Sequence, residues 1–154
     1  MSRLAEVKRP LDPKKFFSEE EKQRIVAAIQ AAEKETSGEI RVHLDRACDG
    51  DVFQRALKVF HKIGMTQTAQ RNGVLIYLAL KNRRFAIVGD EGIDRVVPEN
   101  FWQDVADILS AHFKEGKFCE GLCAAIARIG EKLKEFFPYR KDDVNELSDE
   151  ISTE

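Results

Sequence analysis

The stretch that most constrains the fold is residues 71–92, which read RNGVLIYLALKNRRFAIVGDEG. Two apolar runs, residues 74–80 and 85–88, have the length of strands and are rich in β-branched or aromatic side chains. The four residues between them form a short turn, so the two strands should be antiparallel neighbours. Because the first run does not alternate polar with apolar residues, protein should cover both of its faces. The sequence therefore predicts a hairpin in the middle of a sheet.

The chain before the hairpin predicts a helix followed by a strand. Ser18 and Glu21 have the spacing of a capping box, in which each side chain satisfies a free backbone donor of the other residue. Apolar residues recur at helical spacing as far as Ala32, and Ser37 with Gly38 should end the helix. Residues 39–45 then alternate apolar and polar side chains. This pattern predicts a strand with one covered and one wetter face at an edge of the sheet.

Further segments predict helices on both sides of the sheet. An apolar stripe that follows Asp51 and stops at Gly64 predicts a helix between the first two strands, which gives a right-handed crossover and parallel strands. Residues 93–97 should form a short extended piece. Two amphipathic helices follow; the first opens at Pro98, and the second contains Gly130, which costs a helix ~1 kcal/mol and so indicates close packing. This order predicts an α/β fold, a three-layer α/β/α sandwich around a small mixed sheet of two parallel strands and an antiparallel hairpin partner.

Composition places the chain among ordinary globular domains. Its 154 residues are 43% hydrophobic and 34% charged, and the net charge of −2 provides no basic field to attract nucleic acid. We find no run with the length of a signal peptide or a spanning helix, so we expect a cytoplasmic protein with no membrane anchor. We also expect a monomer. The pattern divides the chain into an N-terminal arm (1–17), a folded domain (18–138) and an acidic tail (139–154), which should be mobile and dispensable.

Topology gathers oxygen-bearing side chains at one edge of the predicted sheet. The starts of the two parallel strands and the end of the third strand share this edge, and the helix that opens at Pro98 begins from it. Carboxylate and amide oxygens suit a hard divalent cation such as calcium or magnesium. The predicted metal ligands are Glu39, Asn72, Asp90, Glu91 and Glu99. A set of solvated loop acids, with Glu99 at a helix N-terminus, explains the same residues equally well.

The opposite edge competes, because open parallel sheets usually bind ligands at the carboxyl ends of their strands. Its charged residues are Asp45, Asp49, Asp51, Lys81, Arg83 and Arg84. A calcium loop that starts at Asp45 fails, because Ala56 stands where the loop needs its bidentate glutamate, and Asp51 is better explained as a helix cap. His43 beside Asp45 is either a base with its orienting carboxylate or part of an exposed polar face.

Three segments together resemble the TPM domain family, which is named for a thylakoid phosphatase, a photosystem repair protein and a receptor modulator. They are ETSGEIRVHL (35–44), NGVLIYLALKNRRFAIVGDEGI (72–93) and FKEGKFCEG (113–121). The resemblance covers residues 16–138, and the tail NELSDEIS (145–152) is similar to that of short bacterial members. Members commonly have an acid where this chain has Arg71. Many also have a tyrosine-containing glycine loop ending in glutamate where this chain has GDEG.

The resemblance implies an α/β/α sandwich, divalent-cation binding, often of calcium, and the weak acid phosphatase activity of the plant member. We therefore expect a stand-alone TPM-like domain that binds calcium or another divalent cation weakly and acts as a protein-interaction module. One alternative is a metal-assisted acid phosphatase in which Arg71 clamps the phosphate. Another is a purely structural interaction module whose acidic sheet edge or tail meets a basic protein partner. The residues themselves identify no catalytic group.

Overall fold

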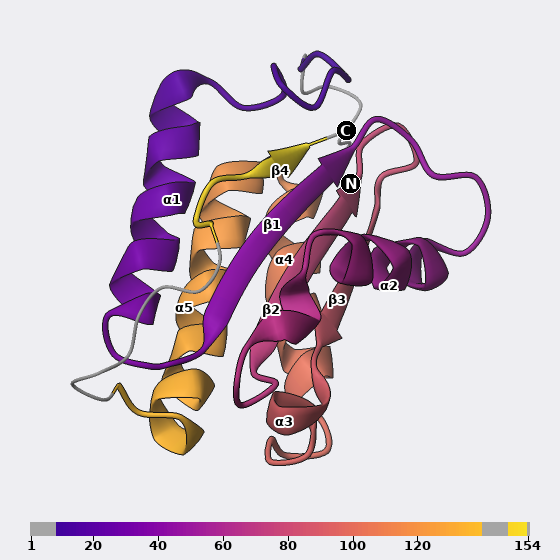
Figure 1. The fold of residues 1–154 in the computed structure, drawn as a ribbon. Coiled ribbons are helices and arrows are strands. Elements are labelled where there is room, and N and C mark those ends of the chain that lie inside the picture. The colour runs from indigo at the N-terminus through magenta and orange to yellow at the C-terminus, as the bar shows by residue number, and fades with distance from the viewer. Residues whose placement is uncertain (1–8, 140–147, 154) are drawn as a thin grey trace.

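A four-stranded mixed sheet, with its strands in the order β3-β2-β1-β4, forms the middle layer of the protein (Figure 1). The structure is a computed structural model that describes residues 9–139 and 148–153. β1 (Glu39–Asp45) and β2 (Gly73–Ala79) run parallel, and β3 (Arg84–Gly89) returns antiparallel to β2. These strands confirm the predicted hairpin and the predicted parallel pair. The fourth strand, β4 (Ser152–Thr153), lies parallel to β1 and comes from the C-terminal tail.

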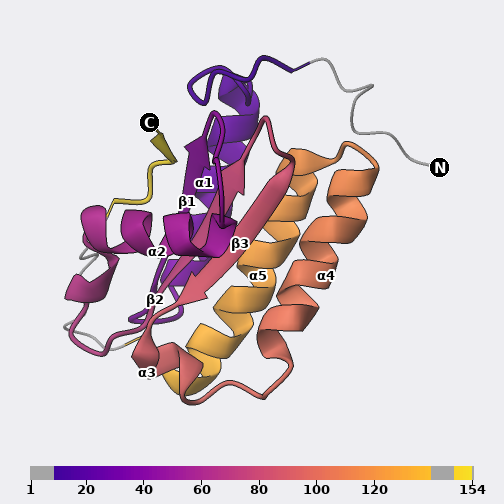
Figure 2. The ribbon, with the colours of Figure 1, turned by 90° about the vertical axis from the view of Figure 1, so that its right-hand side faces the viewer.

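Helices cover both faces of the sheet, so the predicted α/β/α sandwich is confirmed (Figure 2). α2 (Val52–Lys62) lies on one face. The other face is covered by α1 (Glu19–Glu33), α4 (Phe101–Lys114) and α5 (Phe118–Phe136), with α5 packed between the other two. Two short elements complete the chain, the 3₁₀-helix η2 (Met65–Gln67) and α3 (Glu91–Asp94). Within the described ranges, no helix combines the length and the apolar character that crossing a membrane requires.

Strand β2 is the centre of the core. Val74, Ile76 and Leu78 belong to the apolar cluster under α1, α4 and α5, whereas Leu75 and Tyr77 belong to the cluster under α2. Each of these side chains is at most 4% exposed. Both faces of the strand are therefore buried, which explains why its sequence does not alternate polar with apolar residues.

The N-terminus of α1 shows why this helix begins where it does. Ser18 Oγ accepts a hydrogen bond from the Glu21 N–H at 3.1 Å, and Glu21 Oε1 accepts one from the Ser18 N–H at 3.0 Å. This reciprocal pair is the predicted capping box. The helix ends at Glu33, before the predicted stop at Ser37 and Gly38. The earlier end places the Glu33 side chain beside the first residues of β1.

Replacing Ser18 by alanine should lower the free energy of unfolding by about 1 kcal/mol, because it removes the hydroxyl that caps α1. Glu21 keeps its two hydrogen bonds to Arg9, so the loss should stay close to that of a single cap. Urea unfolding followed by circular dichroism measures the change. A loss below about 0.3 kcal/mol would show that this cap contributes little to the fold.

Helices α1 and α5 approach closely at Gly130. A Cβ atom on this glycine would lie 2.8 Å from the Ala32 Cβ, which is closer than two such atoms can pack. The close packing predicted at Gly130 is therefore confirmed. The helix propensity that glycine loses is offset by the contact that it permits between the two helices.

The segment after the hairpin differs from its prediction. The sequence predicts an extended piece at residues 93–97, but the structure has the short helix α3 and a turn there. Asp90 begins this helix, because its side chain accepts a hydrogen bond from the Glu91 N–H at 2.8 Å. A capping acid that directly follows a strand is the signal that identifies this turn of helix.

The N-terminal residues also pack more closely than an extended arm would. Phe16 and Phe17 are 8% and 2% exposed and belong to the core cluster beside α1 and α5. Arg9 holds this segment in place with hydrogen bonds of 2.7 and 2.8 Å to the Glu21 carboxylate. Burial of the two adjacent aromatic rings stabilises this packed segment more than the two preceding prolines favour an extended chain. Residues 1–8 lie outside the described residues.

The end of the tail is part of the sheet, whereas the sequence predicts mobile chain over residues 139–154. Ser152 pairs with His43 and Thr153 with Leu44 in the β1–β4 ladder. β1 is therefore an inner strand of the sheet, not the predicted edge strand. The prediction for residues 140–147 and 154 falls outside the part of the chain that the structure describes.

Candidate functional site

Three of the predicted ligands, Glu39, Asn72 and Asp90, lie side by side where β1 and β2 begin and β3 ends. The Glu39 N–H points to the Asn72 carbonyl oxygen at 3.4 Å, and the Asp90 N–H donates to the Gly73 carbonyl oxygen at 2.9 Å. The three residues are buried, at 2%, 1% and 6% exposed. Glu99 is exposed before α4, and no hydrogen bond or ion pair within the described chain joins it to the others. The predicted edge thus exists, with Glu99 apart from it.

Arg71 neutralises the Asp90 side of this edge. Its guanidinium binds the Asp90 carboxylate through hydrogen bonds of 2.6 and 2.8 Å and donates to Glu91 Oε1 at 3.2 Å. Gly92 permits this arrangement, because a Cβ atom there would lie 2.1 Å from the Gln70 carbonyl oxygen. Asp90 and Glu91 therefore have a cationic partner within the chain, which weakens their attraction for a further cation.

Glu39 belongs to a different group of acids, the carboxylate cluster of Glu33, Glu39 and Asp149. One carboxylate oxygen from each residue lies within 4.8 Å of the other two. Glu33 ends α1, Glu39 opens β1 and Asp149 precedes β4, so the cluster joins three elements. Glu33 Oε2 also accepts a hydrogen bond from the Ile40 N–H at 2.9 Å, which holds this side chain against the start of β1.

Electrostatics in the carboxylate cluster favour a bound positive charge. Burial, together with a hydrogen bond to Asp149 and the nearby charge of Glu39, raises the pKa of Glu33 to about 11. Glu33 therefore holds a proton at neutral pH, in a place that a metal ion can take. Its Oε1 is buried and accepts no hydrogen bond from the described residues, and the same is true of Asn72 Oδ1 at this edge.

Sequence reasoning does not include Glu33 and Asp149 among the ligands. For Glu33 a signal exists: α1 has no basic residue in its last turn and ends on an acid, where the helix dipole disfavours negative charge. An acid in such a position is a candidate for a role outside the helix. Asp149 has no comparable local signal, because other acids surround it in the tail. Only the pairing of β4 with β1 brings it to the site.

A second polar group is buried along the α2 side of β1. His43 is fully buried and Asp45 is 4% exposed, so the interpretation of these residues as an exposed polar face is wrong. His43 Nε2 lies 2.8 Å from Asp45 Oδ1, and His43 Nδ1 lies 2.9 Å from Ser152 Oγ. Asp45 Oδ2 also accepts hydrogen bonds from the Tyr77 hydroxyl at 2.5 Å and from Arg55 Nε at 2.8 Å. Sequence alternation predicts the strand correctly but cannot show partners on other elements.

The hydrogen-bond partners of Asp45 favour its charged form. Burial disfavours the Asp45 charge, but hydrogen bonds from Arg55, Tyr77 and His43 hold the pKa of Asp45 below its ordinary value. An ionised carboxylate only accepts hydrogen bonds, so His43 Nε2–H is the donor to Asp45 Oδ1, and His43 Nδ1 contacts the Ser152 hydroxyl. His43 is thus oriented by a carboxylate, and the hydrogen-bonded chain ties β4 to β1 and β2.

The end of the sheet opposite the carboxylate cluster carries charges of both signs. At the end opposite the carboxylate cluster, Asp51 accepts a hydrogen bond from the Gln54 N–H at 2.9 Å and caps α2, which confirms its interpretation as a helix cap. Arg83 and Arg84 lie at this end, in and just after the hairpin turn, beside a cavity. The carboxylate cluster therefore lies where the parallel strands begin, whereas Arg83 and Arg84 lie, together with Asp45, Asp49 and Asp51, where those strands end.

Comparisons with known proteins agree with this architecture. A family model of the TPM domain matches residues 11–132. Among solved structures, the chain is similar to the BA42 protein from the psychrophilic bacterium Bizionia argentinensis. The two share 45% sequence identity with a TM-score of 0.86, over 92% of this chain and 97% of that one. No curated protein matches the chain.

Two more distant NMR structures share the fold. One is the N-terminal domain of the cg2496 protein from Corynebacterium glutamicum, with 16% identity and a TM-score of 0.61 over 76% of this chain and 74% of that one. The other is an N-terminal domain from P. gingivalis, with 19% identity and a TM-score of 0.63 over 80% and 82% of the two chains. The family match spans every described element except β4 and the last turn of α5. The chain therefore belongs to the TPM domain family.

Proposed function

We propose that this TPM domain binds a divalent cation, calcium in the first place, through Glu33, Glu39 and Asp149. The observation that carries the proposal is the convergence of three carboxylate oxygens within 4.8 Å at a site where Glu39 is buried and the other two residues are partly buried. Hard oxygen ligands of this kind suit calcium and magnesium, and water can complete the coordination shell. Of the ligands predicted from sequence, this set retains Glu39.

The binding should be weak. A cation must displace the proton that Glu33 holds, and this exchange costs part of the binding free energy. Three carboxylates from three elements also form a less rigid cage than a single calcium loop does. We expect a dissociation constant on the order of 10⁻⁴ to 10⁻³ M, as in weak calcium modules. A bound ion would fasten α1, β1 and the segment before β4 to one another, which suits a cation-dependent interaction module.

The hydrogen bonds of Arg71 to Asp90 and Glu91 favour this proposal over a metal-assisted phosphatase. That alternative needs Arg71 as a clamp for phosphate, but Asp90 and Glu91 occupy its guanidinium with hydrogen bonds of 2.6 to 3.2 Å. A phosphate would have to compete with two carboxylates already in place. The carboxylate cluster itself repels an anion. Cation binding requires no such rearrangement of Arg71.

Calcium titration followed by amide NMR tests the proposal. Calcium should shift the amides of Glu33, Glu39 and Asp149, and Glu33→Gln should weaken binding by about tenfold or more because it removes one charged ligand. Glu99→Gln is the matched control, since it removes an exposed acid outside the carboxylate cluster. Shifts centred on Asp90 and Glu91 would move the site to the Arg71 side. An absence of shifts at millimolar calcium would reject the cation site.

The same titration has a pH dependence that identifies Glu33. Because its pKa is raised, calcium must displace a proton at neutral pH, so the apparent affinity should rise with pH. Displacement of one proton corresponds to about tenfold in affinity per pH unit between about pH 6 and 8. In Glu33→Gln, the residual affinity should vary little over this range. An affinity of the parent protein that is flat with pH would exclude Glu33 as a protonated ligand.

A further inference from the structure

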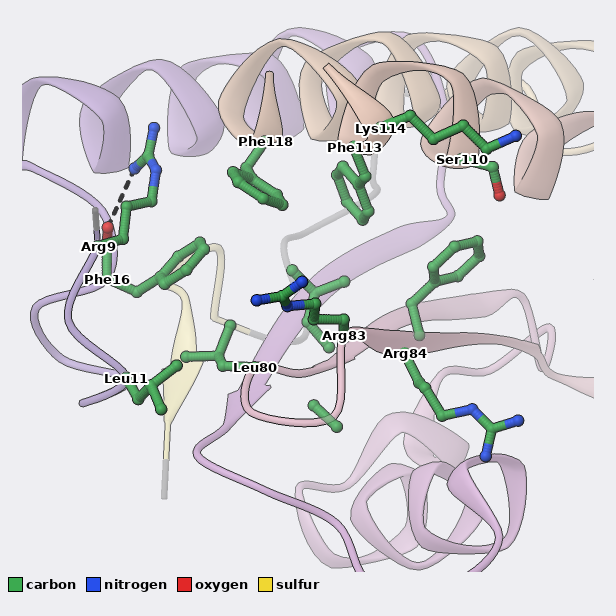
Figure 3. A pocket seen from close by; sticks show the side chains of 13 residues that line it. Arg9, Leu11, Phe16, Leu80, Arg83, Arg84, Ser110, Phe113, Lys114 and Phe118 are labelled. Atoms are coloured by element: carbon green, nitrogen blue, oxygen red, sulfur yellow. Dashed lines mark hydrogen bonds between the residues drawn. The ribbon is translucent and has the colours of Figure 1, made fainter. Parts of the chain in front are cut away.

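A cavity lies at the opposite end of the sheet from the carboxylate cluster. Its volume is about 280 Å³, and it opens between the hairpin turn, α4, the start of α5 and the N-terminal segment (Figure 3). It lies where the parallel strands β1 and β2 end, which is the usual place for ligands in open α/β sheets. Its volume is near the lower end of the ~300–1,000 Å³ typical of ligand sites, so it suits a small molecule.

Aromatic rings form one continuous wall of this cavity. Phe16 meets Phe118 edge to face, with 5.3 Å between their ring centroids, and Phe118 meets Phe113 at 5.2 Å. Phe113 in turn meets Phe85 at 5.8 Å with the ring planes perpendicular. These four rings come from the N-terminal segment, α5, α4 and β3. A flat aromatic body can continue this series of ring contacts.

The charge around the cavity has one sign. The lining contains four cationic side chains and no acid: Arg9, Arg83, Arg84 and Lys114. Arg9 is matched by Glu21 at 2.7 Å and lies over the rings of Phe16 and Phe118. The other three cations form no ion pair with any residue that the structure describes. A ligand that enters this cavity therefore meets positive charge that none of the described residues matches.

Arg83 is the cation placed to meet a ligand. Figure 3 shows its guanidinium over the middle of the cavity, between Leu80 and the rings of Phe113 and Phe118, while Arg84 and Lys114 extend outwards at the rim. A guanidinium presents parallel donors that match a carboxylate and can also lie over an aromatic ring. Both kinds of contact are possible at this position.

We propose that this cavity binds a small aromatic carboxylate. The ring system would pack along the phenylalanine wall, and the carboxylate would bind Arg83 with Lys114 in support. Apolar burial would supply most of the affinity, and the charge would select anions over neutral or cationic molecules of the same shape. The site is separate from the carboxylate cluster, so this inference does not depend on cation binding.

The first test compares three ligands on the full chain by calorimetry and amide NMR. The probe is 2-naphthoate, its neutral counterpart is 2-naphthylmethanol, and decanoate supplies the same charge on a flexible acyl chain. We expect 2-naphthoate to shift the amides of Leu80, Phe85 and Phe113, and to bind about fivefold tighter or more than either comparison ligand. Equal binding of the neutral alcohol would overturn the role of charge. Tighter binding of decanoate would overturn the aromatic preference.

Two pairs of variants locate the site. Arg83 has a positive φ of 55°, which asparagine tolerates, so Arg83→Asn removes the charge without harm to the turn. This variant should weaken the binding of 2-naphthoate about fivefold or more. Arg95→Asn, at an exposed position at the other end of the sheet, should leave the affinity for 2-naphthoate unchanged.

The second pair tests the cavity itself. Ser110 lines it, so Ser110→Phe should fill the space and abolish binding, while Ala111→Phe on the exposed side of the same helix should not. Melting temperatures of all four variants show whether each remains folded. Binding that survives both Arg83→Asn and Ser110→Phe in folded protein would reject this cavity as the site.

Discussion

Replacing Asp45 by alanine should destabilise the protein by about 3–5 kcal/mol, because it removes a buried charge that three side chains share as their acceptor. Arg55 Nε and the Tyr77 hydroxyl donate to Asp45 Oδ2, and His43 Nε2 contacts Oδ1. His43 and Tyr77 are fully buried, so water cannot easily replace the carboxylate. Urea unfolding measured at neutral pH gives the loss.

The matched control is Asp49→Ala, since Asp49 is an exposed acid in the loop that follows β1. That variant should change the free energy of unfolding by no more than about 0.5 kcal/mol. The loss in free energy of unfolding for Asp45→Asn should lie between those of the two alanine variants, because the amide keeps the shape of the side chain but loses the charge. A cost below about 1 kcal/mol for Asp45→Ala would show that the buried group relaxes or takes up water.

The pH dependence of the free energy of unfolding provides a second test of the role of Asp45. Because its partners hold the pKa of Asp45 below 3.8, its contribution is complete above that value and is lost as pH falls through the folded-state pKa. Glu33 acts with the opposite sign. Its raised pKa gives stability that is complete below 4.5 and declines as pH rises towards about 11. Asp45→Asn should therefore reduce the acid-side loss, and Glu33→Gln should reduce the decline above neutral pH.

The central hairpin and the parallel pair were predictable because their signals are local. The apolar run of β2, the turn that follows it and the capping box of Ser18 each lie within a few neighbouring residues. The carboxylate cluster depends instead on a contact between distant parts of the chain. Asp149 reaches Glu33 and Glu39 only because Ser152 and Thr153 pair with β1, and a two-residue strand has too little pattern to reveal itself.

The prediction of an exposed polar face at His43 and Asp45 failed for a related reason. Alternation along residues 39–45 indicates two unlike faces, and a polar face is usually wet. Here Tyr77 on β2, Arg55 on α2 and Ser152 on β4 supply the hydrogen bonds that make burial of His43 and Asp45 affordable. The four phenylalanines of the cavity show the same limit. Phe85, Phe113 and Phe118 each fit an apolar core pattern in their own segments, whereas Phe16 falls in the predicted N-terminal arm. Only the packed structure shows that together they line an open space.

Removing residues 148–154 should weaken calcium binding by about tenfold or more and also destabilise the fold. The deletion takes away Asp149, one of three acids in the carboxylate cluster, and so removes a charged ligand. It also removes β4 and the Ser152 hydroxyl that contacts His43 Nδ1 at 2.9 Å. Loss of that buried contact should cost about 1–3 kcal/mol. This outcome replaces the expectation from sequence that the whole tail is dispensable.

Two point variants separate these effects. Ser152→Ala keeps the strand and the carboxylate cluster, so it should cost stability while calcium affinity stays close to that of the parent protein. Asp149→Asn keeps the strand but removes a charge, so it should lose calcium affinity. Without calcium it should be at least as stable as the parent at neutral pH, because burial and Asp149 together raise the pKa of Glu33.

The deletion also exposes the backbone of β1 along its outer side. Without β4, β1 becomes an edge strand, whose free backbone groups can pair with another chain. The shortened protein should therefore self-associate more than the parent, as measured by analytical ultracentrifugation. If the deletion variant instead keeps the parent's stability, calcium affinity and degree of self-association, then β4 contributes neither to the sheet nor to the site in solution. The cluster would then consist of Glu33 and Glu39 alone, and two carboxylates would have to account for any cation that binds.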